Sequence, residues 1–107
     1  MKSGSPGGAI RVITDKRLKE FWIEHPDSEK PLKAWLRLMK VKKYQSPHEV
    51  REDFGAADFL REMVTVFDIG GNKYRLVVTI RYDLGIVFIR HVVTHKEYDR
   101  LTNQGGF

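Results

Sequence analysis

The chain has 107 residues, of which 41% are hydrophobic and 31% charged, as expected for a globular protein rather than a disordered or fibrous one. This length allows one small core, and the absence of cysteine excludes disulfides, thiolate nucleophiles and thiolate metal sites. The net charge of +5 makes a polyanion a reasonable partner, although charge alone is a weak signal. Because no apolar run suits a membrane span or a secretory signal, we expect a soluble, cytoplasmic protein.

The N-terminal segment differs in composition from the rest of the chain. Residues 1–9 are small, polar and rich in glycine, so we expect a flexible extension, either native or left over from cloning. A single domain is expected over residues 10–107. It opens with a β-branched run at residues 10–14, which predicts a short strand.

Two helices are predicted next, because apolar residues recur at positions i, i+3, i+4 and i+7. Thr14 or Asp15 can cap the first helix, which Pro26 stops, and Asp27 or Ser28 can cap the second. We expect both helices to pack against each other and against a sheet. Their apolar faces are Leu18, Phe21, Trp22 and His25 in the first helix, and Leu32, Trp35, Leu36 and Met39 in the second.

A short third helix and a loop are predicted before the strand-rich part of the chain. Ser46 and Glu49 have the spacing of a capping box, with a proline between them at the first helical position. The segment 55–58 has the composition of a loop that leads into a sheet.

The last part of the chain predicts a three-strand antiparallel meander at residues 63–69, 73–82 and 86–93, with glycine-containing turns between the strands. The predicted fold class is therefore α+β. An N-terminal strand and two helices pack on one face of a three- to four-stranded, mainly antiparallel sheet, and a short C-terminal helix follows.

The middle strand of this meander has a basic face. Its even positions are apolar and its odd positions include Lys73, Arg75 and Arg81, so the sheet face away from the helices should carry cations. This strip suits RNA, although solvated strand faces are often basic without a ligand.

The register of the last two strands decides where two further residues point. A two-residue loop at Leu84 and Gly85 places Arg90 on the basic face and turns His91 into the core. A three-residue loop exchanges them. We favour the first register because it avoids burying Arg90.

The stretch THKEYDRL, residues 94–101, begins the last helix. Thr94 and Glu97 have capping-box spacing, but His95 and Lys96 are cations in a first helical turn, where they oppose the helix dipole. A helix N-terminus attracts phosphate and favours a neutral imidazole, which can accept a proton. With Arg75 nearby, these groups suit ribonucleotide phosphodiester cleavage through the 2′-hydroxyl.

These residues also carry a family resemblance. The segments GGNKYRL and THKEYD within Val66–Leu101, together with RVITDKRLKEF at Arg11–Phe21, resemble the HigB toxins of type II toxin-antitoxin systems. The resemblance implies a RelE-like fold and an mRNA interferase, a metal-independent endoribonuclease that cleaves mRNA, often on the ribosome, and so inhibits translation and growth. It implies no cofactor, and neutralisation by a HigA-type helix-turn-helix antitoxin.

The resemblance to HigB toxins also implies which residues form the site. By the resemblance, His95, Arg75, Lys73 and Tyr98 are the catalytic candidates, and Arg90 lies where the family places a basic residue. The division between acid and base stays open. Lys96, Arg81 and Asn72 complete the RNA-binding candidates. The alternative hypothesis is a non-catalytic RNA- or ribosome-binding module that uses the same basic face.

Overall fold

The computed structural model describes residues 11–13, 16–61 and 63–105. The predicted extension at residues 1–9 and the predicted cap at Thr14 or Asp15 lie outside these described residues. The elements in chain order are β1 (Arg11–Ile13), α1 (Lys16–Glu24), the 3-10 helix η1 (Pro26–Ser28), α2 (Glu29–Val41), α3 (Pro47–Asp53), β2 (Asp58–Phe59), β3 (Val64–Ile69), β4 (Tyr74–Arg81), β5 (Ile86–Thr94) and α4 (His95–Asn103).

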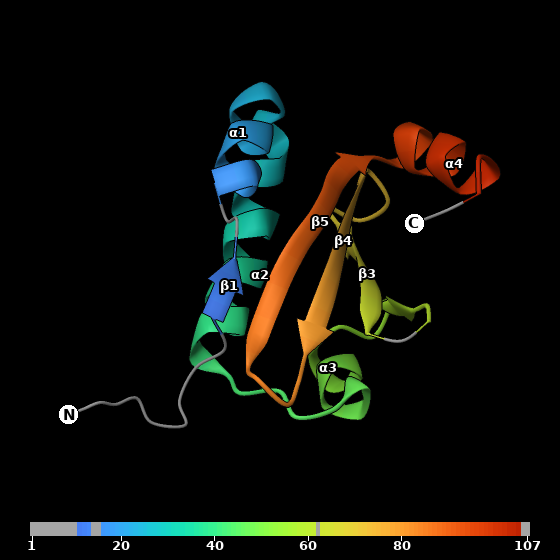
Figure 1. Ribbon diagram of the computed structural model, residues 1–107. Helices are drawn as coiled ribbons and strands as arrows, with labels where there is room; N and C mark the ends of the chain where they lie inside the picture. The colour runs from blue at the N-terminus through green and yellow to red at the C-terminus, as the bar shows by residue number, and fades with distance from the viewer. Residues whose placement is uncertain (1–10, 14–15, 62, 106–107) are drawn as a thin grey trace.

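The predicted α+β class is confirmed. In the described part of the chain, one five-stranded sheet has the order β1-β5-β4-β3-β2, with β1 parallel to β5 and the other pairs antiparallel. The two-residue strand β2, on the outer edge beside β3, was not predicted. Figure 1 shows α1 and α2 stacked along the β1 side, with α3 and α4 at opposite ends of the sheet. No helix among the described residues is long and apolar enough to cross a membrane.

The core lies between α1, α2 and one face of the sheet, as alternation in β4 predicts. Leu18, Leu32 and Trp35 are buried from the helical side, and Leu76 and Ile80 from β4. The Trp35 ring meets the Phe67 ring of β3 edge to face, with centroids 5.5 Å apart. The opposite face of the sheet, which we call the open face, carries the odd-numbered residues of β4.

Two of the predicted helix caps are confirmed. The hydroxyls of Ser46 and Thr94 accept hydrogen bonds from the backbone N–H groups of Glu49 and Glu97, at 3.4 and 3.1 Å. Each bond satisfies a donor that the first helical turn would otherwise leave open. Ser28 does precede α2, but its hydroxyl donates to the carbonyl of His25 instead of capping the helix.

The predicted register between β4 and β5 is wrong, because the pairing is interrupted by a β-bulge. Val77 pairs with His91 and Val78 with Ile89, so Arg90 is an extra residue without an opposite partner in β4. The three-residue-loop register therefore holds only beyond the bulge, and nearer the turn the pairing moves by one more residue. The connecting turn spans residues 82–85, with Gly85 at φ +68°.

The prediction that His91 points into the core is wrong, because the bulge changes which face its side chain takes. Arg90 Nη1 donates to Thr79 Oγ1 at 3.3 Å, and His91 lies opposite Val77, so both side chains belong to the open face. In a regular strand two successive side chains point to opposite faces, whereas a bulge redirects one of them. His91 is consequently half-buried on the open face and is not a core histidine.

Candidate functional site

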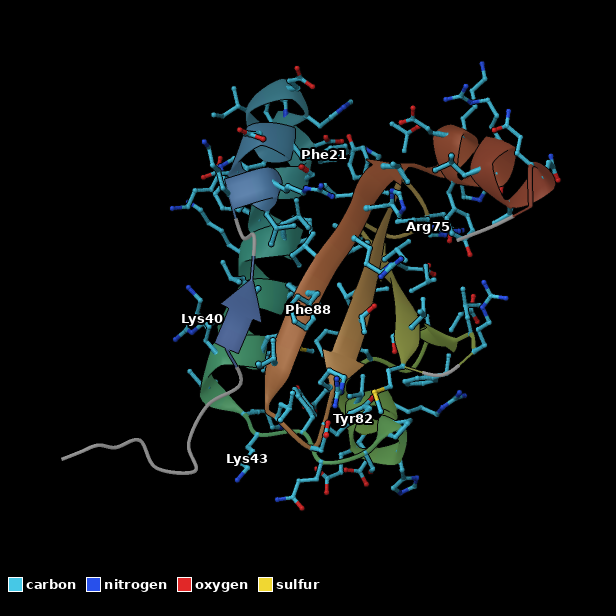
Figure 2. The ribbon with its side chains drawn as sticks, in the orientation of Figure 1. Phe21, Lys40, Lys43, Arg75, Tyr82 and Phe88 are labelled. Carbon is cyan, nitrogen blue, oxygen red and sulfur yellow. The ribbon has the colours of Figure 1, made fainter. Side chains whose placement is uncertain are left out.

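The candidate site lies on the open face, at the end of the sheet where β5 passes into α4. Its floor is apolar, because Val66 and Val77 are almost fully buried there by the side chains around them. Asp68 of β3 pairs with Arg75 of β4 in the sheet register, so a carboxylate and a guanidinium share this end of the face. Figure 2 shows Arg75 on the side of the sheet nearest α4.

Arg75 is held by three contacts. Its Nε lies 3.3 Å from Asp68 Oδ1, its Nη1 donates to the Tyr74 carbonyl at 3.3 Å, and its guanidinium carbon lies 5.8 Å from the centre of the Tyr98 ring. The side chain is only 13% exposed. A cation restrained in this way can stabilise developing phosphate charge with little reorganisation.

Tyr98 comes from the second turn of α4 and lies half-buried against the sheet. Burial raises the pKa of its phenol above the usual value, and the negative charge of Asp58 on β2 acts in the same direction, while Arg75 opposes both. Tyr98 is therefore a protonated phenol at neutral pH. It can donate a hydrogen bond to an oxygen that gains negative charge.

His95 is fixed at both its backbone and its ring. Its backbone N–H donates to the carbonyl of Lys73 at 2.9 Å, which joins the start of α4 to the turn before β4. Its Nδ1 lies 3.1 Å from Asp99 Oδ2, one helical turn further on. A carboxylate at Nδ1 assigns the ring proton to that nitrogen, so Nε2 is left as the proton acceptor.

Lys73 takes part in the site through its carbonyl, while its ammonium is engaged elsewhere. Its Nζ lies 2.9 Å from Asp27 Oδ2 of η1, and the Tyr74 hydroxyl donates to the other oxygen of the same carboxylate. These bonds hold the pKa of Asp27 below its usual range, with the Tyr74 hydrogen bond as the larger cause and Lys73 as the second. Asp27 was predicted as a possible helix cap, and its side chain instead ties the turn to the helical layer.

The structure does not bring all the predicted RNA-binding residues together. Arg81 makes a bidentate ion pair with Asp83, at the far end of β4 and about 20 Å along the strand from Arg75. Lys96 is exposed on α4 beside Thr94, Glu97 and Arg100, and Asn72 is exposed in the turn before β4. Arg90 alone among these four lies over the middle of the open face.

Several residues of this face were missed by sequence reasoning. Burial lowers the pKa of His91, and the charges of Arg90 and Arg17 lower it further, so its imidazole is neutral at neutral pH. Arg17 belongs to α1, and its contact with β5 has no local sequence signal. Asp68 did have a local sequence signal, because alternation in β3 places it on the same face as Val66.

The fold and the site define a small α+β protein with a fixed arginine, a carboxylate-oriented histidine and a protonated phenol at one end of a basic sheet face. Residues 28–101 match the family model of the HigB toxins, described as the RelE-like toxic component of a toxin-antitoxin system. Because this match spans more than half of the chain, the protein belongs to the HigB toxin family, as predicted. A toxin of such a system has an antitoxin as its partner.

Curated relatives agree with this membership. The mRNA interferase HigB of Escherichia coli O6:H1 (strain CFT073) is 28% identical over 95 residues, which cover 87% of this chain and 92% of the relative. The mRNA interferase toxin HigB of Escherichia coli K12 is 30% identical over 95 residues, covering 87% and 91%. The mRNA interferase HigB of Shigella flexneri gives the same values, 30% identity over 95 residues.

Proposed function

We propose that this protein is an mRNA interferase, a toxin that cleaves mRNA and thereby inhibits translation and growth. The observation that carries the proposal is the oriented histidine: His95 has Asp99 at Nδ1 and stands at the end of the sheet where Arg75 is restrained. The names of the curated relatives support the same activity. Membership of a toxin family supports growth arrest as the outcome.

The proposed reaction begins with the 2′-hydroxyl of the RNA. His95 Nε2 removes its proton, the 2′ oxygen attacks the adjacent phosphorus, and the bond from phosphorus to the 5′ oxygen breaks. Tyr98, whose raised pKa keeps it protonated, transfers its proton to the departing 5′ oxygen, and solvent then carries the proton from His95 to the Tyr98 phenolate. The products are a 2′,3′-cyclic phosphate and a 5′-hydroxyl. No metal or cofactor takes part in this scheme.

Arg75 supplies the positive charge that the pentacoordinate phosphorus requires. Charge develops on the non-bridging oxygens as the 2′ oxygen adds, and a restrained guanidinium placed there lowers the barrier without first having to be ordered. Removal of one comparable hydrogen-bond donor in other enzymes costs on the order of 100- to 1,000-fold in rate. In this proposal Lys73 keeps His95 in place through its carbonyl rather than acting on the phosphate directly.

The partner and the place of action form the finer part of the proposal. We propose that the antitoxin is a HigA-type helix-turn-helix protein, and that cleavage takes place in the cytoplasm on messages bound to the ribosome. The resemblance of the segments 70–76 and 94–99 to HigB toxins supports both points. Co-purification with a HigA-type antitoxin and cleavage assays with and without ribosomes test them separately.

The decisive experiment maps transcript 5′ ends after brief induction of the wild type, His95→Ala and His48→Ala. His48 is the matched control, because it is an exposed histidine on α3, also paired with a carboxylate, at the other end of the molecule. We expect new 5′-hydroxyl ends and growth arrest with the wild type and His48→Ala, and neither with His95→Ala.

The alternative hypothesis, a non-catalytic RNA- or ribosome-binding module, gives the opposite pattern. Growth would then stop with intact transcripts, and His95→Ala would act like the wild type, provided that it is folded. Thermal unfolding of the purified variant shows whether it is folded. New 5′ ends that appear equally with His95→Ala would also reject the assigned chemistry.

A further inference from the structure

We propose that the groove between α1 and β5 is a second RNA subsite, which binds a nucleotide flanking the scissile one through a phosphate between Arg17 and Arg90 and a base on Phe88. This inference rests on the proposed function, since it assumes that single-stranded RNA is the substrate. It adds residues of α1 and the middle of β5 to an interface otherwise built from β4 and α4.

The groove exists because β1 covers only part of β5. β1 pairs with β5 from Ile86 to Phe88, and beyond this point α1 lies alongside β5. Arg17 of α1 donates through Nη1 to the backbone carbonyl of Arg90 at 2.7 Å. A guanidinium has five N–H donors, so one group can hold this carbonyl and also present donors to a phosphate.

The β-bulge supplies the second arginine. Because Arg90 is the extra residue, its side chain shares the open face with both Phe88 and His91. Two arginines from different elements therefore border one groove. Their joint field is evident at His91, whose pKa both of them lower in addition to the larger effect of burial.

The distribution of charge within the groove indicates where a phosphate fits. The groove consists of two adjoining hollows that share Arg17, Arg90 and His91. The hollow toward α1 also contains Glu20 and Glu24, which repel anions. No acidic side chain among the described residues lines the hollow toward Phe88. Its volume of about 320 Å³ lies at the lower end of the range for small-ligand sites, roughly 300–1,000 Å³.

Phe88 provides a stacking surface beside this hollow. It is 40% exposed, on the open face opposite Thr79. Bases stack on exposed aromatic rings with roughly 1–3 kcal/mol per base, irrespective of sequence. Figure 2 shows Phe88 partway along β5, away from Arg75 and on the side of β1.

The spacing from the cleavage site suits a flanking nucleotide rather than the scissile one. Arg75 pairs with Val93 and Thr79 pairs with Phe88, so the two positions are four residues apart along β4, which corresponds to about 13 Å along the strand. His91 lies between them and lines both hollows. Its neutral imidazole adds no charge, so RNA can pass over it from one subsite to the other.

The test measures binding of RNA whose 2′-hydroxyls are methylated, so that it cannot be cleaved. Random-sequence pools about four and about ten nucleotides long are compared, for the wild type, Arg17→Ala, Phe88→Ala and Lys19→Ala. Lys19 is the matched control, because it is an exposed cation of α1 that does not line either hollow. Arg17→Lys, which keeps the positive charge at this position of α1, guards against a loss of folding.

We expect the wild type and Lys19→Ala to bind the longer pool at least tenfold more tightly than the shorter one. Phe88→Ala should lose about fivefold or more on the longer pool. Arg17→Ala should lose most of the gain and lower the slope of log affinity against log salt by roughly one, with Arg17→Lys intermediate. An unchanged length dependence in both alanine variants would overturn the subsite.

Two further outcomes separate this inference from the proposed function. If the longer RNA binds as expected but the wild type produces no new transcript ends in cells, the subsite stands and the cleavage proposal fails. If Arg17→Ala weakens the complex with the antitoxin and leaves RNA binding unchanged, the groove is a protein-docking surface and the subsite is rejected.

Discussion

The Nδ1 atom of His95 lies 3.1 Å from Asp99 Oδ2, on the same face of α4 and one turn apart. This i,i+4 spacing is fixed by the helix itself, so the imidazole is oriented by a residue that also belongs to the THKEYD segment. The carboxylate assigns the ring proton to Nδ1 and leaves Nε2 available to take up a proton.

Asp99→Asn should therefore reduce cleavage without abolishing RNA binding. An amide at this position can present its N–H₂ group to Nδ1 and favour the wrong tautomer, and the same change in the serine-protease triad costs about 10⁴-fold, which is the upper limit expected for this more exposed pair. Single-turnover cleavage of RNA checks this. Glu97→Gln is the control, because Glu97 pairs with Arg100 instead. Equal rates for Asp99→Asn and Glu97→Gln would show that His95 needs no orienting carboxylate.

Arg75→Lys should lose most of the activity although the charge is kept. The guanidinium touches Asp68, the Tyr74 carbonyl and the Tyr98 ring at once, and an ammonium has no planar fork to reproduce that arrangement. We expect a fall in cleavage rate of about 100-fold, with RNA affinity changed much less. The measurement is the rate at saturating RNA. An Arg75→Lys variant of normal rate would mean that charge alone suffices.

Thr94→Ala should weaken both the start of α4 and cleavage. It removes the side-chain acceptor of the Glu97 N–H and is expected to cost about 1 kcal/mol of stability. His95 lies in the same helical turn, so fraying there also misplaces the imidazole. Thr94→Ser keeps the hydroxyl and should restore both stability and rate. Thermal unfolding and a cleavage assay on the wild type, Thr94→Ala and Thr94→Ser check this. Equal cleavage rates for Thr94→Ser and Thr94→Ala would show that the cap has no influence on cleavage.

Acid stability should depend on Asp27. The Tyr74 hydroxyl and then Lys73 lower its pKa in the folded protein, so the unfolded chain binds the proton more readily. The stabilisation is fully present above the usual aspartate pKa of about 3.9 and is lost as the pH falls through the lower folded value. Asp27→Asn should thus show a shallower loss of melting temperature from about pH 5 to pH 3. The pH dependence of the melting temperature of Tyr74→Phe should lie between those of the wild type and Asp27→Asn. Parallel curves for all three proteins would show that Asp27 does not contribute to acid stability in this way.

Local rules predicted the parts of the site that depend on neighbouring residues in the chain. The capping boxes at Ser46 and Thr94 involve residues three apart, and their geometry does not depend on the rest of the fold. The alternation in β4 placed Leu76 in the core and Arg75 on the open face in the same way. The family resemblance then directed attention to His95, beyond what its position alone justified.

Contacts between distant segments could not be predicted in this way. Asp27 has good capping chemistry, and only the approach of the turn before β4 explains why it binds Lys73 and Tyr74 instead. Arg17 reaches the Arg90 carbonyl across 73 positions of sequence. The pairing of β4 with β5 between the bulge and the turn could not be predicted either. Both loop lengths that we considered assume a regular strand, and neither allows for an extra residue within β5.

The β-bulge at Arg90 also bears on how this chain can change in length over evolution. Deletion of one residue there would restore regular pairing with Ile89 and Val92 still toward the core, but only one of Arg90 and His91 would then remain on the open face. The exposed turn at residues 70–73 contributes no side chain to the groove, although the Lys73 carbonyl limits how far the turn can shift. Insertions and deletions should therefore be rare between Ile89 and Val93 among HigB toxins that use this groove, and where they occur, Phe88 should change with them.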